Sequence, residues 1–381
     1  MLLDLGFLAR KLTGYREQFQ ESTAELAEAT GIPEASLAAY ERGEREPSGD
    51  EILILADHYK CDYRYFVSSD RVAPFDEIEV LFRSHDKEFS KEDRWSVLQF
   101  LYLCDCEEFL LDALAREPRR PFAFTKEGTS FKGQGRQAAA ALREHLGHGP
   151  ERVADVYRDV RSLGLHVFRR ELRNSRISGL CMRHPQAHGC ILVNYGEDPY
   201  RQRFTAAHEL AHALLDDEPV VVSFVSHGGT HELPEVRANA FASAYLLPPD
   251  ALRRLPDPGR WTAEDAVRWA SQMQVSTEAL AHALDEAGRV SLPQKRIILG
   301  ARVPAHRKED PELPQTLAVR ERERREELLR LGLSASYVSL CFDAYEASAI
   351  TAGRLAEALL GDERNLGRMA ELYGRHLDHS A

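Results

Sequence analysis

The stretch that decides the fold reads H-E-L-A-H, residues 208–212, inside the longer run RQRFTAAHELAHALLDD, residues 201–217. The run predicts a helix, because its apolar residues recur on one face. His208 and His212 then lie on the same face, about 6 Å apart along the axis, so both imidazoles can bind one cation. Zinc is the cation that this pair favours. Glu209 is turned by about 100° around the helix, which places its carboxylate where a general base is needed.

A third ligand must follow downstream, because catalytic zinc sites use three protein ligands and a water molecule. A second helix is predicted from about residue 234 to the Pro-Pro pair at 248–249. Glu235 in its first turn is the predicted third ligand, and Glu232 and His231, which precede the helix, are the alternatives. Asn239, one turn after Glu235, is a candidate for orienting the ligands.

The two segments together resemble the ImmA/IrrE family of zinc metallopeptidases, in which HExxH is followed by E-x-x-A-N-x-F-A-x-x-x-L-x-P. Here the second part reads EVRANAFASAYLLP, residues 235–248. The metzincin pattern is excluded, because it requires Gly and His where the chain has Leu215 and Glu218. The resemblance implies that Glu209 activates water for peptide hydrolysis. His227, His231 and Tyr245 are the candidates for stabilising the oxyanion.

The run LAEATGIPEASLAAYERGEREP, residues 26–47, resembles a Cro/repressor-type (Xre) helix-turn-helix. Its second helix, around residues 34–40, offers no Gln, Asn, Lys or Arg side chain to read a base edge. Residues 1–70 also hold seven Lys and Arg residues against fourteen Asp and Glu residues, whereas phosphate contacts need the opposite balance. Binding of duplex DNA through residues 1–70 and a scaffold or protein-docking role therefore both stay open.

The composition indicates a globular protein of several domains. The 381 residues are 43% hydrophobic and 29% charged, with a formal net charge of −12. No apolar run is long enough to cross a membrane and the N-terminus lacks a signal peptide, so we expect a cytoplasmic protein. Six scattered cysteines without a CxxC pattern are expected to be reduced thiols.

We expect a mostly α-helical fold with a small β-sheet, an α+β protein. The predicted domains are a helix-turn-helix at 1–70, a helical linker region at 71–150, the zinc peptidase at 151–292 and a C-terminal helical domain at 293–381. Residues 164–168, 176–182 and 190–194 are predicted strands beside the metal-binding helix, and an edge strand there could bind an extended peptide. Residues 118–135 are predicted to be a loop, with a helix from Arg136 to Leu146.

Two further features lead to hypotheses. Cys106 or Cys104, on a long helix before the peptidase, could bind the zinc ion as an inhibitory thiolate; the alternative is a small buried side chain. Within 158–176, six arginines stand against two acidic residues, and they could bind single-stranded DNA as an activating signal or neutralise acidic neighbours. These arginines are Arg158, Arg161, Arg169, Arg170, Arg173 and Arg176.

The resulting hypothesis is a zinc-dependent endopeptidase with one Zn²⁺ per chain. The family resemblance implies that the substrate is a helix-turn-helix repressor, cleaved in response to stress, DNA damage or phage infection, and relatives of this kind are associated with bacterial antiphage systems. The alternative is a helix-turn-helix transcriptional regulator whose peptidase-like domain is a non-proteolytic sensor. No membrane partner is expected.

Overall fold

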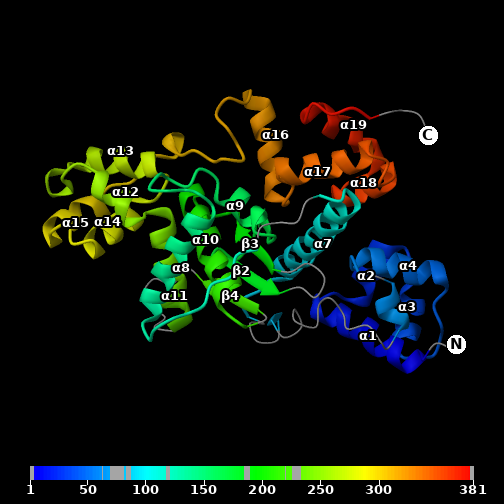
Figure 1. Ribbon diagram of the computed structural model, residues 1–381. Helices are drawn as coiled ribbons and strands as arrows, with labels where there is room; N and C mark the ends of the chain where they lie inside the picture. The colour runs from blue at the N-terminus through cyan, green and yellow to red at the C-terminus, as the bar shows by residue number, and fades with distance from the viewer. Residues whose placement is uncertain are drawn as a thin grey trace. The chain divides into compact units, whose positions relative to one another are not determined.

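The computed structural model describes residues 4–61, 63–68, 81–82, 87–116, 121–183, 189–218, 220–224 and 233–377. The chain divides into two compact units, Met1–Leu103 with Leu172–Asn174, and Cys104–Glu171 with Ser175–Ala381. The described residues are mostly helical and contain a four-stranded sheet, which confirms the predicted α+β class (Figure 1).

The first unit contains the predicted helix-turn-helix. Ser22 and Glu25 cap the start of α2 reciprocally. Gly31 ends α2 in the left-handed region, at φ 72°, and the next residue, Ile32, is buried. The helices are α1 (Leu5–Gln18), α2 (Thr23–Thr30), α3 (Glu34–Glu41), α4 (Gly49–His58) and α5 (Arg64–Val67), and the long helix α7 (Lys91–Ala113) begins in this unit and ends in the second.

The second unit is built around the sheet, whose strand order is β1-β3-β2-β4. β1 pairs with β3 in parallel, and the other two pairings are antiparallel. The strands are β1 (His166–Arg170), β2 (Ile177–Arg183), β3 (Gly189–Asn194) and β4 (Val220–Phe224). Three of them lie within about two residues of the predicted strands, whereas β4 was not predicted from the sequence.

Helix α10 (Pro199–Leu215) packs on the sheet against β2 and β3. Helix α11 (Leu233–Leu246) packs beside α10, and α8 (Phe131–His145) packs against α11. The start of α8 corrects the predicted loop: Ser130 accepts a hydrogen bond from the Gly133 amide and so caps a helix that contains two glycines. Gly135 is needed there, because a Cβ would overlap the backbone oxygen of Arg237 on α11.

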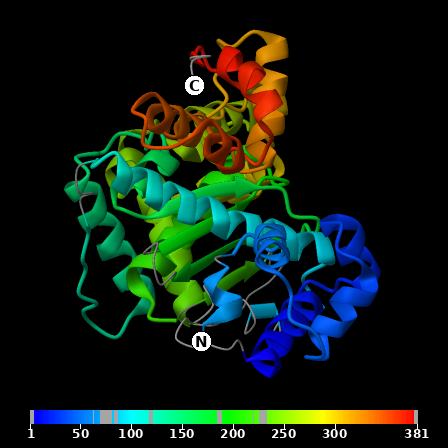
Figure 2. The same cartoon turned by 90° about the vertical axis from the view of Figure 1, so that its right-hand side faces the viewer.

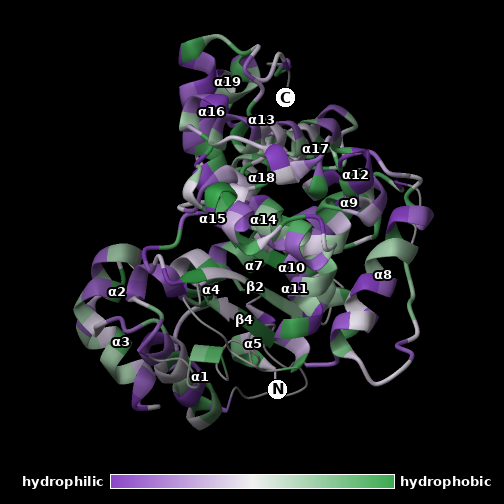
Figure 3. Cartoon of the chain, turned by 90° about the vertical axis from the view of Figure 1, so that its left-hand side faces the viewer, coloured by the Kyte–Doolittle hydropathy of each residue, from purple (hydrophilic) through white to green (hydrophobic). Residues whose placement is uncertain are grey.

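The remaining helices of this unit form two groups. Helices α9, α13, α14 and α15 contribute to the same buried core as α8, α10 and α11. Helices α16 to α19 gather on the β1 side, where Arg170 forms a β-bridge with Leu331 (Figure 2). Figure 3 shows that α16 is largely hydrophilic. The bounds are α9 (Val156–Ser162), α12 (Pro249–Arg254), η1 (Pro258–Arg260), α13 (Ala263–Met273), α14 (Thr277–Glu286), α15 (Leu292–Gly300), η2 (Ala305–Arg307), α16 (Val319–Arg330), α17 (Ala335–Glu346), α18 (Ala352–Ala358) and α19 (Glu363–Leu372).

The turn between α13 and α14 repeats the turn between α2 and α3. Gln274 takes the left-handed conformation at φ 54°, Val275 is buried, and Ser276 caps α14. Gly31 and Ile32 occupy the same order of positions after α2.

Among the described helices, none combines the length and the apolar character that crossing a lipid bilayer requires.

Candidate metal centre

Helix α10 presents the two histidines of the HExxH segment to one point. Asp198 caps the helix and Pro199 occupies its first turn, and these two residues determine where the helix begins. The Nε2 atoms of His208 and His212 lie 3.0 Å apart, and both residues are buried. The four-residue spacing therefore produces the convergence that the sequence indicates.

Glu235, from the first turn of α11, completes the group. One carboxylate oxygen lies 3.3 Å from Nε2 of His208 and the other lies 3.3 Å from Nε2 of His212. Burial alone would raise the pKa of Glu235, but the hydrogen bonds to the two histidines outweigh it and hold this pKa well below the usual range. Among the described residues, these three are the group of His, Cys, Asp and Glu side chains whose ligand atoms lie close enough to hold one metal ion.

The hydrogen bonds of the histidines show that the group fits a metal. Nδ1 of His208 lies 3.1 Å from Oδ1 of Asn239, and Nδ1 of His212 lies 2.5 Å from Oδ2 of Asp216. Each acceptor favours the tautomer with the proton on Nδ1, which leaves a lone pair on Nε2. Two such lone pairs 3.0 Å apart, facing a carboxylate, repel one another unless a cation lies among them. A set of two histidines and one glutamate is a ligand set of catalytic zinc sites.

Glu209 lies against the sheet beside this group. Its side chain is fully buried, and neither carboxylate oxygen has a hydrogen-bond partner among the described residues. Burial raises the pKa of Glu209, although the neighbouring His208 and His212 act in the opposite direction. Gly179 on β2 leaves the space for this carboxylate, because a Cβ at that position would lie 2.9 Å from Oε1 of Glu209.

Sequence reasoning missed Asp216 and Arg237. Asp216 follows His212 by four residues and so faces the same way. Arg237 lies two residues after Glu235, and its guanidinium donates to Asp216. No local pattern identifies Arg237, because its role depends on the packing of α11 against α10 and α8.

The two cysteines proposed as inhibitory ligands do not reach the metal-binding group. The buried thiol of Cys104 lies beside Cys190 on β3, and the thiol of Cys106 lies 3.8 Å from the guanidinium of Arg354. Among the described residues, neither sulfur belongs to the group of ligand atoms that lie within 4.8 Å of one another. The cysteine-switch hypothesis is therefore not supported, and the buried-thiol alternative describes both residues.

The oxyanion candidates divide into two cases. The hydroxyl of Tyr245 donates to Asp159 on α9 at 2.8 Å in a buried position. The structure therefore corrects its assignment as an oxyanion donor, because a hydroxyl held in this way is not free for a substrate. His227 and His231, together with the alternative ligand Glu232, lie outside the described residues.

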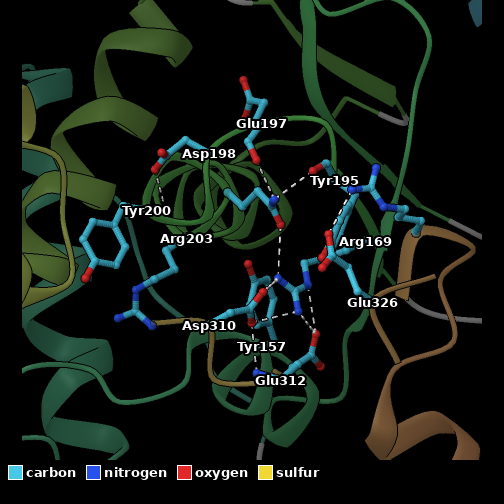
Figure 4. A network of polar contacts seen from close by, with 12 residues as sticks. Tyr157, Arg169, Tyr195, Glu197, Asp198, Tyr200, Arg203, Asp310, Glu312 and Glu326 are labelled. Atoms are coloured by element: carbon cyan, nitrogen blue, oxygen red, sulfur yellow. Dashed lines mark hydrogen bonds and ion pairs between the residues drawn. The ribbon is translucent and has the colours of Figure 1, made fainter. Parts of the chain in front are cut away.

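Half of the proposed nucleic-acid patch is used inside the fold. Arg169 is fully buried and pairs with Asp310 and Glu312, each at 2.7 Å (Figure 4). Arg161 also pairs with Glu312, at 3.0 Å, and Arg170 is buried and donates to the backbone of Leu331. The guanidinium groups of these three arginines form ion pairs or hydrogen bonds inside the fold, so they are not available to contact DNA. Arg158 and Arg176 stay exposed, and Arg173 pairs with Glu92 on the surface of the first unit.

Comparison with known proteins gives two family matches. Residues 160–285 match the IrrE N-terminal-like domain, and residues 15–66 match a helix-turn-helix. The radiation response metalloprotease IrrE of Deinococcus radiodurans is 36% identical over 107 residues, which are 26% of this chain and 31% of that protein. The protein of the same name from Deinococcus deserti is 37% identical over 107 residues, which are 26% of this chain and 37% of that protein. No solved structure matches the chain.

Two segments of the chain therefore match known domains, an IrrE N-terminal-like domain and a helix-turn-helix, which confirms both resemblances. The peptidase match includes α10 and α11, and with them His208, Glu209, His212 and Glu235. The chain spans about a third of the length of the curated relatives it matches. Residues 67–159 and 286–381 lie outside both family matches.

Proposed function

We propose that the chain is a zinc-dependent endopeptidase that cleaves a protein partner, a helix-turn-helix repressor. The observation that carries the proposal is the convergence of His208, His212 and Glu235, with the carboxylate of Glu209 beside them. When bound, zinc supplies Lewis-acid chemistry, which makes a water molecule acidic near neutral pH and polarises a peptide carbonyl.

The proposed role of Glu209 is to take the proton of that water and to deliver it to the leaving amine. Its burial supports this role, because a raised pKa makes the Glu209 carboxylate a stronger base toward the proton of the water molecule. His208, His212 and Glu235 are proposed to hold the metal, and Asn239 and Asp216 to orient the two imidazoles.

The substrate is proposed to bind along β4 as an extended strand. One edge of the sheet, β1, is partly covered, since the amide of Glu171 donates to the backbone of Arg330 and Arg170 bridges to Leu331. Among the described residues the other edge is β4, which pairs there with β2 on one side only. A peptide that adds to this edge would satisfy its outer backbone groups.

The names of the curated relatives support DNA damage or another stress as the trigger of cleavage. The buried arginines give no support to activation by single-stranded DNA through the 158–176 patch, because only Arg158 and Arg176 of its second-unit members stay exposed. We therefore propose stress or DNA damage as the trigger of cleavage, and we assign no role in it to the 158–176 patch.

The test measures metal content and cleavage together. The purified chain is analysed for zinc and incubated with the helix-turn-helix repressors encoded beside it. We expect one zinc per chain and a specific cut, and we expect Glu209→Gln to keep zinc but to lose cleavage by about 100- to 10,000-fold. Glu278→Gln, an exposed glutamate on α14, is the matched control. Zinc binding without any cleavage would favour the alternative function, a regulator with a sensory peptidase-like domain.

A further inference from the structure

A buried ion pair joins the end of α10 to the start of α11. Asp216 accepts from Arg237 with one carboxylate oxygen, and the other lies 2.5 Å from Nδ1 of His212. The Asp216 side chain is 2% exposed and that of Arg237 is 7% exposed. We propose that Arg237 is a positioning residue that acts through Asp216 on His212, and that α8 holds Arg237 in place. The inference rests on the proposed function, because it concerns how the chain binds zinc.

As a metal ligand, His212 must present the lone pair of its Nε2 atom. Its Nε2 lone pair is available only while Nδ1 keeps its proton and donates to an acceptor of fixed orientation. Asp216 is that acceptor, and a carboxylate partner also makes the imidazole a stronger donor to a metal. A buried carboxylate without a cationic partner would be strongly destabilised. Arg237 supplies the cation and a directional hydrogen bond, so it fixes the orientation of Asp216.

Helix α8 then determines where the Arg237 guanidinium lies. The Gln134 side chain accepts from Arg237 at 3.3 Å and donates to the backbone of Gly128 at 2.8 Å. The ring of Phe131 lies beneath the guanidinium, with 5.1 Å between its centroid and the central carbon. Gly135 allows α8 to approach the backbone of α11 at this point. Three neighbouring residues of α8 thus surround one arginine.

The same segment also holds the end of α10. The ammonium group of Lys126 donates to the backbone oxygen of Leu215 at 2.6 Å, directly before Asp216. Residues 121–145 therefore contact both helices that carry the proposed ligands, at the end where Asp216 orients His212. All of this segment lies outside the two matched segments, 15–66 and 160–285. The geometry of the centre depends on a part of the chain that the family matches do not include.

The test measures zinc affinity by competition with a chromophoric chelator, using the full chain. We expect Arg237→Met to weaken zinc binding by about 10- to 100-fold, the range typical of residues that orient a metal ligand. Arg237→Lys keeps the charge and is expected to restore part of the affinity. Arg254→Met is the matched control, because Arg254, at the end of α12, forms an exposed pair with Glu151. Its zinc affinity is expected to equal that of the unchanged chain.

A double variant separates positioning from general destabilisation. If Arg237 acts through Asp216, adding Arg237→Met to Asp216→Asn weakens zinc binding no further, whereas independent effects would multiply. The absorption spectrum of the Co²⁺-loaded chain reports the ligand geometry directly. If Arg237→Met does not fold, Gln134→Ala replaces it, with an expected loss of about tenfold.

Two outcomes would overturn the inference alone: a folded Arg237→Met chain with unchanged zinc affinity, or effects that multiply in the double variant. An unchanged chain that binds no zinc would instead overturn the proposed function, and the inference with it. The two failures are therefore distinguishable in one set of titrations.

Discussion

Replacing Gly179 by alanine tests the position of the proposed general base. The added Cβ would lie 2.9 Å from Oε1 of Glu209, 2.8 Å from Cγ2 of Thr205 and 2.9 Å from the backbone oxygen of Leu192. Leu192 cannot retreat without disturbing the β2–β3 ladder, in which Gly179 pairs with Val193. The side chains of Glu209 and Thr205 must therefore move.

The size of the movement follows from these distances. Ordinary contact begins at 3.4 Å, so the Glu209 carboxylate must shift by about half an ångström. Overpacking of this kind costs about 1–3 kcal/mol of the free energy of unfolding. Because a misplacement of about 1 Å can lower a rate about 100-fold, we expect kcat to fall about tenfold.

The assay compares cleavage of the repressor, zinc content and urea unfolding. Zinc content is expected to stay at the value of the unchanged chain, because Gly179 contacts Glu209 and neither histidine ligand. Gly367→Ala on α19 is the control, since a Cβ there meets nothing within 4 Å. It is expected to stabilise its helix by about 0.5–1 kcal/mol without changing cleavage. Unaltered cleavage and stability in Gly179→Ala would refute the placement of Glu209 against the sheet.

Two other changes have defined outcomes. Tyr245→Phe removes the hydrogen bond to Asp159, so we expect the free energy of unfolding, measured in urea, to fall by about 1–3 kcal/mol. We expect no change in kcat, and a large loss of kcat would restore Tyr245 as an oxyanion donor. For His166, burial alone would lower the pKa, but the ion pairs with Glu107 and Glu108 outweigh it and raise the pKa to about 10. The folded-state pKa thus lies above the unfolded value near 6.5. The resulting stabilisation is complete below about pH 6.5 and disappears as the pH rises through about 10. The free energy of unfolding of the unchanged chain should therefore fall over this pH range, and that of His166→Gln should lack this fall. An equal fall in both chains would contradict the ion pairs.

Local spacing explains what could be predicted from the sequence. The four-residue interval of His208 and His212 fixes their common face on any α-helix, and the turn at Gly31 and Ile32 has a specific backbone requirement. Glu235 was found because it begins the next predicted helix. Each of these features depends on a short segment, and each has the expected place in the structure.

Long-range pairing explains what could not be predicted. The arginines of 158–176 have the spacing of an exposed basic patch, yet Arg169 is buried by acidic residues some 140 positions later, at Asp310 and Glu312. No periodicity in the segment carries that information. The same holds for Arg237, whose partners Gln134 and Asp216 come from two other helices. Asp216 differs, because its four-residue distance from His212 was visible in the sequence.

The segment that matches the peptidase family packs against residues that lie outside it on both sides. Residues beyond 285 supply Asp310 and Glu312, the two carboxylates that pair with the buried Arg169 on β1. Beginning the chain at residue 160 would remove α8, whose Leu142 is fully buried in the shared core and contributes about 1.5–3 kcal/mol by its burial alone. Residues from both flanks therefore pack against the part of the chain that carries the metal-binding helices, and we expect substitutions in either flank to alter the site without replacing a ligand.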